Sequence, residues 1–107
     1  MFARVVSATL EPSKANEFRS TVSGQVESTL RTQPGFVELI SLTDETDTSK
    51  VIAISLWRTR HDVDKYESSA ASRVIAQVKP FVRDIKIAHY GVDSGTAKTL
   101  AASVTAA

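Results

Sequence analysis

The segment from Val51 to Tyr66 (VIAISLWRTRHDVDKY) constrains the fold most, because it joins an apolar strand directly to the start of a helix. Its first seven residues carry no charge and are mainly branched or aromatic, which predicts a buried strand over Val51–Trp57. Thr59 stands three residues before Asp62, a spacing at which a threonine hydroxyl caps the first turn of a helix. We therefore expect a strand that leads straight into a capped helix.

The N-terminal part of the chain has the same succession of strand and helix. Phe2–Leu10 is predicted to be a strand with apolar or small residues on both faces, and Pro12 ends it. From Ser13 to Leu30, apolar residues recur every three or four positions, which predicts an amphipathic helix of about five turns. Gly24 in its middle costs about 1 kcal/mol relative to alanine. A strand or ligand that approaches closely is one reason for a glycine there.

Two more strands and a second helix complete the pattern. Phe36–Thr43 is predicted to form an antiparallel hairpin with the strand of the opening segment, across the polar turn Asp44–Lys50. A helix is expected over Arg60–Val78 with a kink or break near Ser68, and Phe81–Val92 is the fourth strand. The order βαββαβ predicts a ferredoxin-like α+β fold, with a four-stranded antiparallel sheet and two helices on one face.

Two helices cover only one face of such a sheet, yet three of its strands carry apolar residues on both faces. We therefore expect a homodimer in which the uncovered sheet faces pack together. The predicted domain spans residues 1–92. Residues 93–107 are rich in Ala, Ser, Thr and Gly, and we interpret them as a C-terminal tail or an arm that docks on a partner.

Composition excludes several classes of function. The 107 residues suit one domain, and a net charge of +1 with interspersed charges argues against nucleic acid as a partner. The chain has no cysteine and only two histidines, so thiolate and metal chemistry are not expected. We find neither a signal peptide nor an apolar run long enough to span a membrane, and we expect a cytoplasmic protein that does not contact membranes.

The candidate site gathers around the only tryptophan. Trp57 either stacks on a planar ligand or is a core residue whose indole N–H finds a carbonyl. Ser55 and Ala53 share its strand face, and their small side chains leave room beside the ring. Tyr66 lies on the inward side of its helix. Its hydroxyl either contacts a substrate oxygen or is the wet tip of a half-buried aromatic.

Three further residues are charged or titratable candidates. His89 is the one imidazole inside a predicted strand, where it is either a base or a structural histidine. Arg4 interrupts an apolar strand face and needs an anion, either a ligand or a carboxylate. An ion pair with Asp84 or Glu38, at the rim or the dimer interface, is the first expectation. His61 follows the helix cap and is expected to be solvated.

The chain resembles the antibiotic biosynthesis monooxygenase superfamily of dimeric α+β barrels. The resemblance covers about residues 2–92 and is carried by the order of elements, by the turn Pro34-Gly35-Phe36 and by the segment Leu56–Arg60 that leads into Asp62–Tyr66. Members of this family include cofactor-independent oxygenases acting on quinols or polyketide-like aromatics, haem-degrading enzymes and small proteins without an assigned reaction.

The family's site residues match only in part. Trp57 matches its pocket tryptophan, but Ala53 stands where its oxygenases commonly have an asparagine, four residues before the tryptophan. The haem-degrading members use a histidine on the second helix and an asparagine on the first strand. Here the second helix offers only His61, at its start, and Phe2–Leu10 contains no asparagine, which disfavours haem.

The resemblance thus implies a cofactor-independent monooxygenase that oxidises a small electron-rich aromatic or quinol-type substrate. Trp57, His89 and Tyr66 are the expected catalytic residues, and Ser55, Ala53 and Arg4 the expected substrate-binding residues. One alternative is a non-catalytic protein with the same fold that binds a small ligand or acts in a stress response. Another is a purely structural interaction domain, which predicts a filled core without a cavity.

Overall fold

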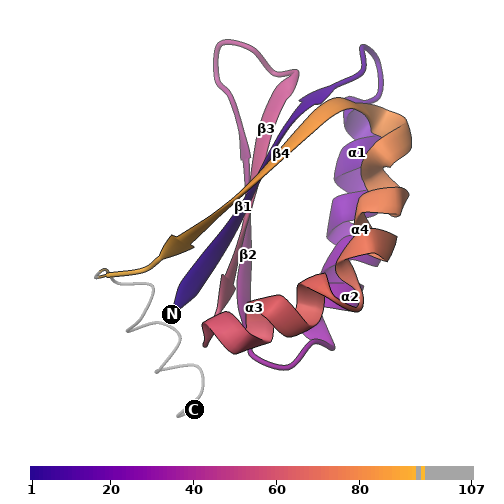
Figure 1. Ribbon diagram of the computed structural model, residues 1–107. Coiled ribbons are helices and arrows are strands. Elements are labelled where there is room, and N and C mark those ends of the chain that lie inside the picture. Colours follow the sequence, from indigo (N-terminus) through magenta and orange to yellow (C-terminus); the bar gives the residue numbers. More distant parts are fainter. Residues whose placement is uncertain (94, 96–107) are drawn as a thin grey trace.

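The computed structural model describes residues 1–93 and 95 and confirms the ferredoxin-like fold (Figure 1). The four strands are β1 Phe2–Leu10, β2 Phe36–Thr43, β3 Lys50–Trp57 and β4 Val82–Gly91. They form one sheet in the order β2-β3-β1-β4, and every neighbouring pair is antiparallel. The expected hairpin of β2 and β3 is present. Of the predicted tail, all but Asp93 and Gly95 lies outside the described residues.

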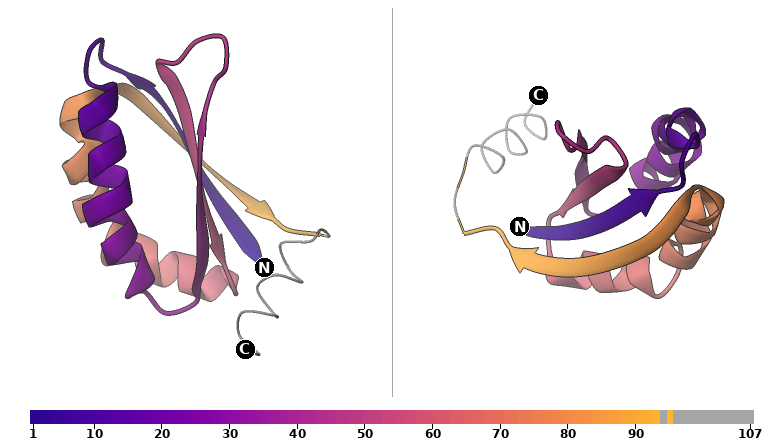
Figure 2. Two further views of the ribbon diagram at one scale, coloured as in Figure 1. Left: turned by 180° about the vertical axis from the view of Figure 1, so that it is seen from behind. Right: turned by 90° about the horizontal axis from the view of Figure 1, so that it is seen from above.

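All the helices of the described chain lie on one face of the sheet (Figure 2). They are α1 Ala15–Thr21, α2 Glu27–Arg31, α3 Arg60–Glu67 and α4 Ala71–Val78, with a π-helical segment at Val22–Val26 and a 3₁₀ turn at Lys79–Phe81. None of the helices in residues 1–93 is long and apolar enough to cross a membrane. The core lies between this helix layer and the sheet.

The first predicted helix is not a regular α-helix. The segment Val22–Val26, which contains Gly24, is π-helical and joins α1 to α2. A Cβ atom on Gly24 would meet no protein atom within 4 Å, so the suggested close approach of a strand to this glycine is wrong. Val26 at the end of the segment is buried, whereas Gly24 is exposed. Segments of this kind are frequent at functional sites.

The second helix begins and breaks where the sequence indicates. The Thr59 hydroxyl accepts a hydrogen bond from the Asp62 amide at 3.1 Å, which confirms the predicted cap. The helix is interrupted between Glu67 and Ala71, as expected near Ser68, and continues as α4 at a different angle (Figure 1). Because of this break, α3 lies across one end of the sheet while α4 runs beside α1.

The turn before β2 brings the two halves of the fold into contact. Gly35 has a φ of +79°, a conformation that side chains rarely adopt, and a Cβ atom there would lie 2.1 Å from Asp62 Oδ2. The Gly35 carbonyl also accepts a hydrogen bond from the Arg58 amide at 2.9 Å. Glycine is therefore required at this position by both the backbone conformation and the adjacent start of α3.

The pairing of β2 with β3 shifts by one residue near the start of β2. Phe36 pairs with Trp57, and Glu38 pairs with Leu56, the next residue along β3. Val37 is therefore an extra residue on the β2 side, which is the arrangement of a β-bulge. From Glu38 onward the pairing is regular as far as Thr43.

The sheet face opposite the helices is apolar, and we call it the open face. Its apolar residues, by their pairing register, include Val5, Ile40, Leu42, Ile52, Ile54 and Tyr90. Ile40, Leu42 and Ile52 are 39%, 46% and 38% exposed, which is high for such large aliphatic side chains. The predicted apolar character of both sheet faces is thus present.

Candidate functional site

A cavity of about 60 Å³ lies between the helix layer and the sheet. Its apolar lining consists of Phe18, Val22, Val26, Leu30, Val74, Ile75 and Val78 from the helices and Val6, Ala8, Leu39, Ala53, Val82 and Ile85 from the sheet region. Three polar side chains, those of Arg4, Ser55 and Tyr66, also line it. A cavity with this lining favours an apolar ligand that carries a few polar atoms.

Sheet register explains why Arg4 and Ser55 lie together. Arg4 on β1 pairs directly with Ser55 on β3 and with His89 on β4, so all three side chains leave the sheet on the helix side. Arg4 and Ser55 are only 5% exposed. Two of the polar groups of the cavity thus come from adjacent central strands, which gives them a rigid support.

The Tyr66 ring packs against both Trp57 and Arg4. Its ring stacks on Trp57 with a centroid separation of 4.9 Å, and the Arg4 guanidinium lies 5.3 Å from its centroid in a cation–π contact. Trp57 in turn meets the edge of Phe36 at a centroid separation of 5.6 Å. Trp57 is fully buried and does not line the cavity, whereas Tyr66 does.

Ser55 links the tryptophan to the arginine backbone. Its hydroxyl accepts a hydrogen bond from Trp57 Nε1 at 2.9 Å and donates to the Arg4 carbonyl at 3.4 Å. The indole N–H of Trp57 is therefore satisfied by a serine two residues earlier on the same strand, where the sequence pattern suggested a carbonyl. This bond fixes the indole plane on which Tyr66 stacks.

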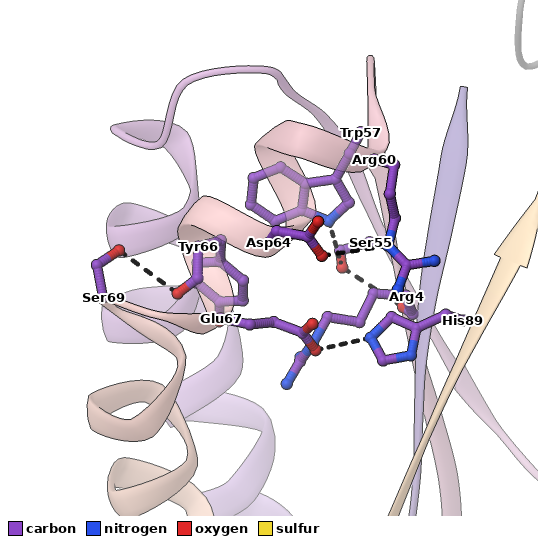
Figure 3. Close-up of polar contacts among 9 residues, drawn as sticks. All are labelled: Arg4, Ser55, Trp57, Arg60, Asp64, Tyr66, Glu67, Ser69 and His89. Carbon is purple, nitrogen blue, oxygen red and sulfur yellow. Dashed lines mark hydrogen bonds and ion pairs between the residues drawn. The ribbon is translucent and has the colours of Figure 1, made fainter.

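Glu67 joins Arg4 and His89, which lie on adjacent strands of the sheet (Figure 3). Arg4 Nε donates to Glu67 Oε2 at 2.9 Å, and His89 Nε2 lies 2.7 Å from the same oxygen. The expected pairing of Arg4 with Asp84 or Glu38 is wrong, because the register puts both of those residues on the open face. The ion pair accordingly lies on the helix side of the sheet.

The pKa values of two site residues are shifted. Burial raises the pKa of the Tyr66 phenol; the Arg4 charge opposes this shift and the Glu67 charge adds to it. Burial also raises the pKa of Glu67, but hydrogen bonds from Arg4 and His89 and their charges outweigh it and lower that pKa overall. At neutral pH, Tyr66 is therefore a hydroxyl donor and Glu67 a carboxylate.

The predicted site residues do not all meet at one place. Arg4, Ala53, Ser55 and Tyr66 line the cavity, while Trp57 lies behind Tyr66. His89 lies on the helix side of the sheet, but it is partly exposed and contacts Glu67 outside the lining. His61 is exposed, as expected.

Glu67 is a site residue that the sequence pattern did not reveal. The available signal was Arg4 on an apolar strand face, which required an anion as its partner. The sequence did not show that the end of α3 lies above that point. No group of three His, Asp or Glu side chains within the described residues is placed to hold a metal ion.

Both the sequence and the fold match known proteins. The model of the antibiotic biosynthesis monooxygenase family matches residues 1–78. SnoaB, a cofactor-independent oxygenase from Streptomyces nogalater, gives a TM-score of 0.75 at 15% identity, covering 88% of this chain and 94% of SnoaB. No curated protein matches the chain.

Two further solved structures carry the name of the same family. A protein from Nitrosomonas europaea gives a TM-score of 0.73 at 20% identity, covering 88% of this chain and 100% of the other. One from Deinococcus radiodurans gives 0.75 at 14% identity, covering 89% and 95%. These likenesses show the fold, and the family model matches most of the sequence. The resemblance to this family is thus confirmed over residues 1–78, and the chain belongs to the antibiotic biosynthesis monooxygenase family.

Proposed function

We propose that the protein is a cofactor-independent monooxygenase that oxidises a small, electron-rich aromatic or quinol-type substrate with dioxygen. The observation that carries the proposal is the apolar cavity between helices and sheet, into which Tyr66, Ser55 and Arg4 bring polar groups. Membership of the family and the shared fold of SnoaB, itself a cofactor-independent oxygenase, support the same reaction.

The proposed reaction needs no electron donor other than the substrate. A ring CH₂ or its enol tautomer becomes a carbonyl, one oxygen atom of O₂ enters the product and the other leaves as water. The substrate loses four electrons and O₂ gains four, so the reaction balances. The protein then has to exclude water, orient the ring and stabilise the substrate anion that reduces oxygen.

The geometry distributes these tasks among the site residues. Tyr66, kept protonated by burial, donates a hydrogen bond to a substrate or peroxide oxygen. Trp57 positions Tyr66 through the stacked contact, while Ser55 supplies a further polar atom in the wall and Ala53 leaves space for the ring. His89 lies outside the cavity lining and contacts Glu67, and it is proposed as a base that the substrate reaches once the cavity has widened.

The cavity must widen to accept a ring. An engineered cavity of about 150 Å³ is known to hold benzene, and the volume here is about 60 Å³. We propose that the helix layer moves outward when substrate enters. Its two interruptions, the π segment Val22–Val26 and the break between α3 and α4, are the points at which such a movement meets the least resistance.

Oxygen uptake tests the proposed reaction. Purified protein without added metal or flavin, mixed anaerobically with hydroquinones and anthrone-like phenols and then aerated, is expected to consume oxygen above the uncatalysed rate. Tyr66→Phe removes the donor hydroxyl and should lower that rate at least about tenfold. Tyr90→Phe removes the same atom from an exposed tyrosine on the open face and should leave the rate unchanged. Equal rates in the two variants would exclude the role of Tyr66.

The second candidate is a non-catalytic protein that binds a small ligand. The small cavity and Ala53 at the position where oxygenases of the family commonly have asparagine favour it. In this case the phenols raise the melting temperature but no oxygen is consumed. The purely structural alternative predicted a filled core, and the cavity argues against it.

We also propose a cytoplasmic homodimer in which two open faces pack together. Light scattering should give twice the 11.6 kDa of one chain. Ile52→Lys places a charge in the open face and should give a monomer. Ile87→Lys is the matched control, because Ile87 is 43% exposed but faces the helix side through its pairing with Val6. A dimer that persists in Ile52→Lys would place the interface elsewhere.

A further inference from the structure

The Arg4 side chain is buried, but only one of its three guanidinium nitrogens has a hydrogen-bond partner within residues 1–93. Arginine carries five N–H donors, and the Nε donor of Arg4 is bound by Glu67. Within residues 1–93, no group accepts a hydrogen bond from either terminal nitrogen, Nη1 or Nη2. Arg4 is only 5% exposed, so little bulk water is in reach to replace these partners.

The unused nitrogens belong to a side chain that lines the cavity. Arg4 lines it, and the remainder of the lining is apolar apart from Ser55 and Tyr66. Figure 3 shows the guanidinium beside the Glu67 carboxylate with a terminal nitrogen pointing away from it. An anionic group inside the cavity therefore finds donors at one end and apolar contacts along the rest of its length.

The local charge does not oppose an anion. Glu67 is the nearby carboxylate, and one of its oxygens is shared between Arg4 and His89. The low pKa of Glu67 reflects this double pairing. Its negative charge is thus directed at Nε and at the imidazole, and the outer edge of the guanidinium stays open.

We infer that the ligand of the cavity is a small aromatic carboxylate whose two oxygens bind the terminal nitrogens of Arg4. The planar two-pronged edge of a guanidinium matches a carboxylate better than a neutral amide or a single phenol oxygen. The aromatic part then lies against the apolar lining near Ala53 and Tyr66. This inference rests on the proposed function for the aromatic nature of the ligand, and it adds the acid group.

Benzoate and benzamide test the inference directly, because they have almost the same shape and differ in charge. Calorimetric titration of the wild-type protein should show benzoate binding at least about tenfold more tightly than benzamide. Arg4→Lys keeps the charge but loses the two-pronged edge and should reduce the preference, and Arg4→Gln should abolish it. Arg60→Gln, which removes an exposed arginine paired with Asp64, should preserve it.

The comparison of benzoate with benzamide on the wild-type protein tests the inference even if an Arg4 variant fails to fold. Equal affinities, binding of neither compound, or a preference that survives in Arg4→Gln would each overturn the inference. Oxygen uptake separates it from the proposed reaction. A benzoate preference without uptake on 2,5-dihydroxybenzoate or hydroquinone upholds the acid site and overturns the oxygenase. Oxygen uptake on hydroquinone without a benzoate preference upholds the oxygenase and overturns the acid site.

Discussion

Trp57→Ala is expected to lower the free energy of unfolding by about 3–5 kcal/mol, the range for truncating a large buried aromatic residue. Trp57 is fully buried, stacks on Tyr66 and meets Phe36 edge-on. Truncation removes both contacts, leaves a void and deprives the Ser55 hydroxyl of its donor. Urea unfolding followed by far-UV circular dichroism measures the loss, since the variant has no tryptophan fluorescence.

Trp57→Phe is the matched control for this prediction. It keeps an aromatic ring against Tyr66 and loses chiefly the indole N–H and part of the packing, so a loss of about 1–2 kcal/mol is expected. Trp57→Phe is also better suited than Trp57→Ala to activity measurements, because a loss of activity in it is not confused with unfolding. A loss below about 1 kcal/mol in Trp57→Ala would show that Trp57 does not hold the core together.

The second large effect is expected for Glu67→Ala. Removal of the carboxylate leaves the buried Arg4 without its ion-pair partner, which costs about 3–5 kcal/mol in a fully buried setting. The Glu67 side chain is 29% exposed, so water reduces the cost, and a loss of about 2–3 kcal/mol is expected. Urea unfolding at pH 7 measures it. Asp64→Ala is the control, because it removes the carboxylate of an exposed ion pair with Arg60 on the same helix.

A double variant and the pH dependence of stability test whether the lost ion pair causes the destabilisation of Glu67→Ala. Arg4→Leu combined with Glu67→Ala removes both charges and should be more stable than Glu67→Ala alone. The folded-state pKa of Glu67 is lowered, so its stabilising contribution is present above its ordinary pKa and is lost as pH falls through the folded pKa. Glu67→Ala should therefore lose less stability on acidification than the wild type. An identical acid dependence would contradict the ion-pair explanation.

The elements of the fold could be predicted because each has a local cause. Alternation and apolar runs indicated the strands, the Thr59 hydroxyl indicated the start of α3, and the serines near Ser68 indicated its break. The π segment could not be predicted in the same way. Gly24 signals a weak point in a helix, but not whether the chain bends, kinks or adds a residue to the turn.

The site was predictable only where strand register decides it. Arg4, Ala53 and Ser55 lie together because alternation places them on one face of adjacent strands. Glu67 reaches the same place through the angle between α3 and the sheet, which is set by packing over the whole core and has no local signature. The exclusion of Trp57 from the cavity wall has the same origin, because Tyr66 comes to lie in front of it.

The bulge at Val37 decides which of the alternating side chains of β2 point toward the cavity and which toward the open face. If β2 continued in strict register from the pair of Phe36 and Trp57, Glu38 would stand opposite Ser55 on the helix side. With the extra residue, Leu39 takes that place, and Glu38 turns to the open face. The bulge thus keeps the Glu38 carboxylate away from the apolar cavity.

It also makes the start of β2 tolerant of a change in chain length. Deletion of Val37 would leave every pair from Glu38 onward as it is, because only the unpaired residue is lost. Deletion of Ser41, in the regular part, would move the rest of the strand to the opposite face or force a new bulge. We therefore expect this chain to lose a residue beside the turn without a change in the cavity lining, but not farther along the same strand.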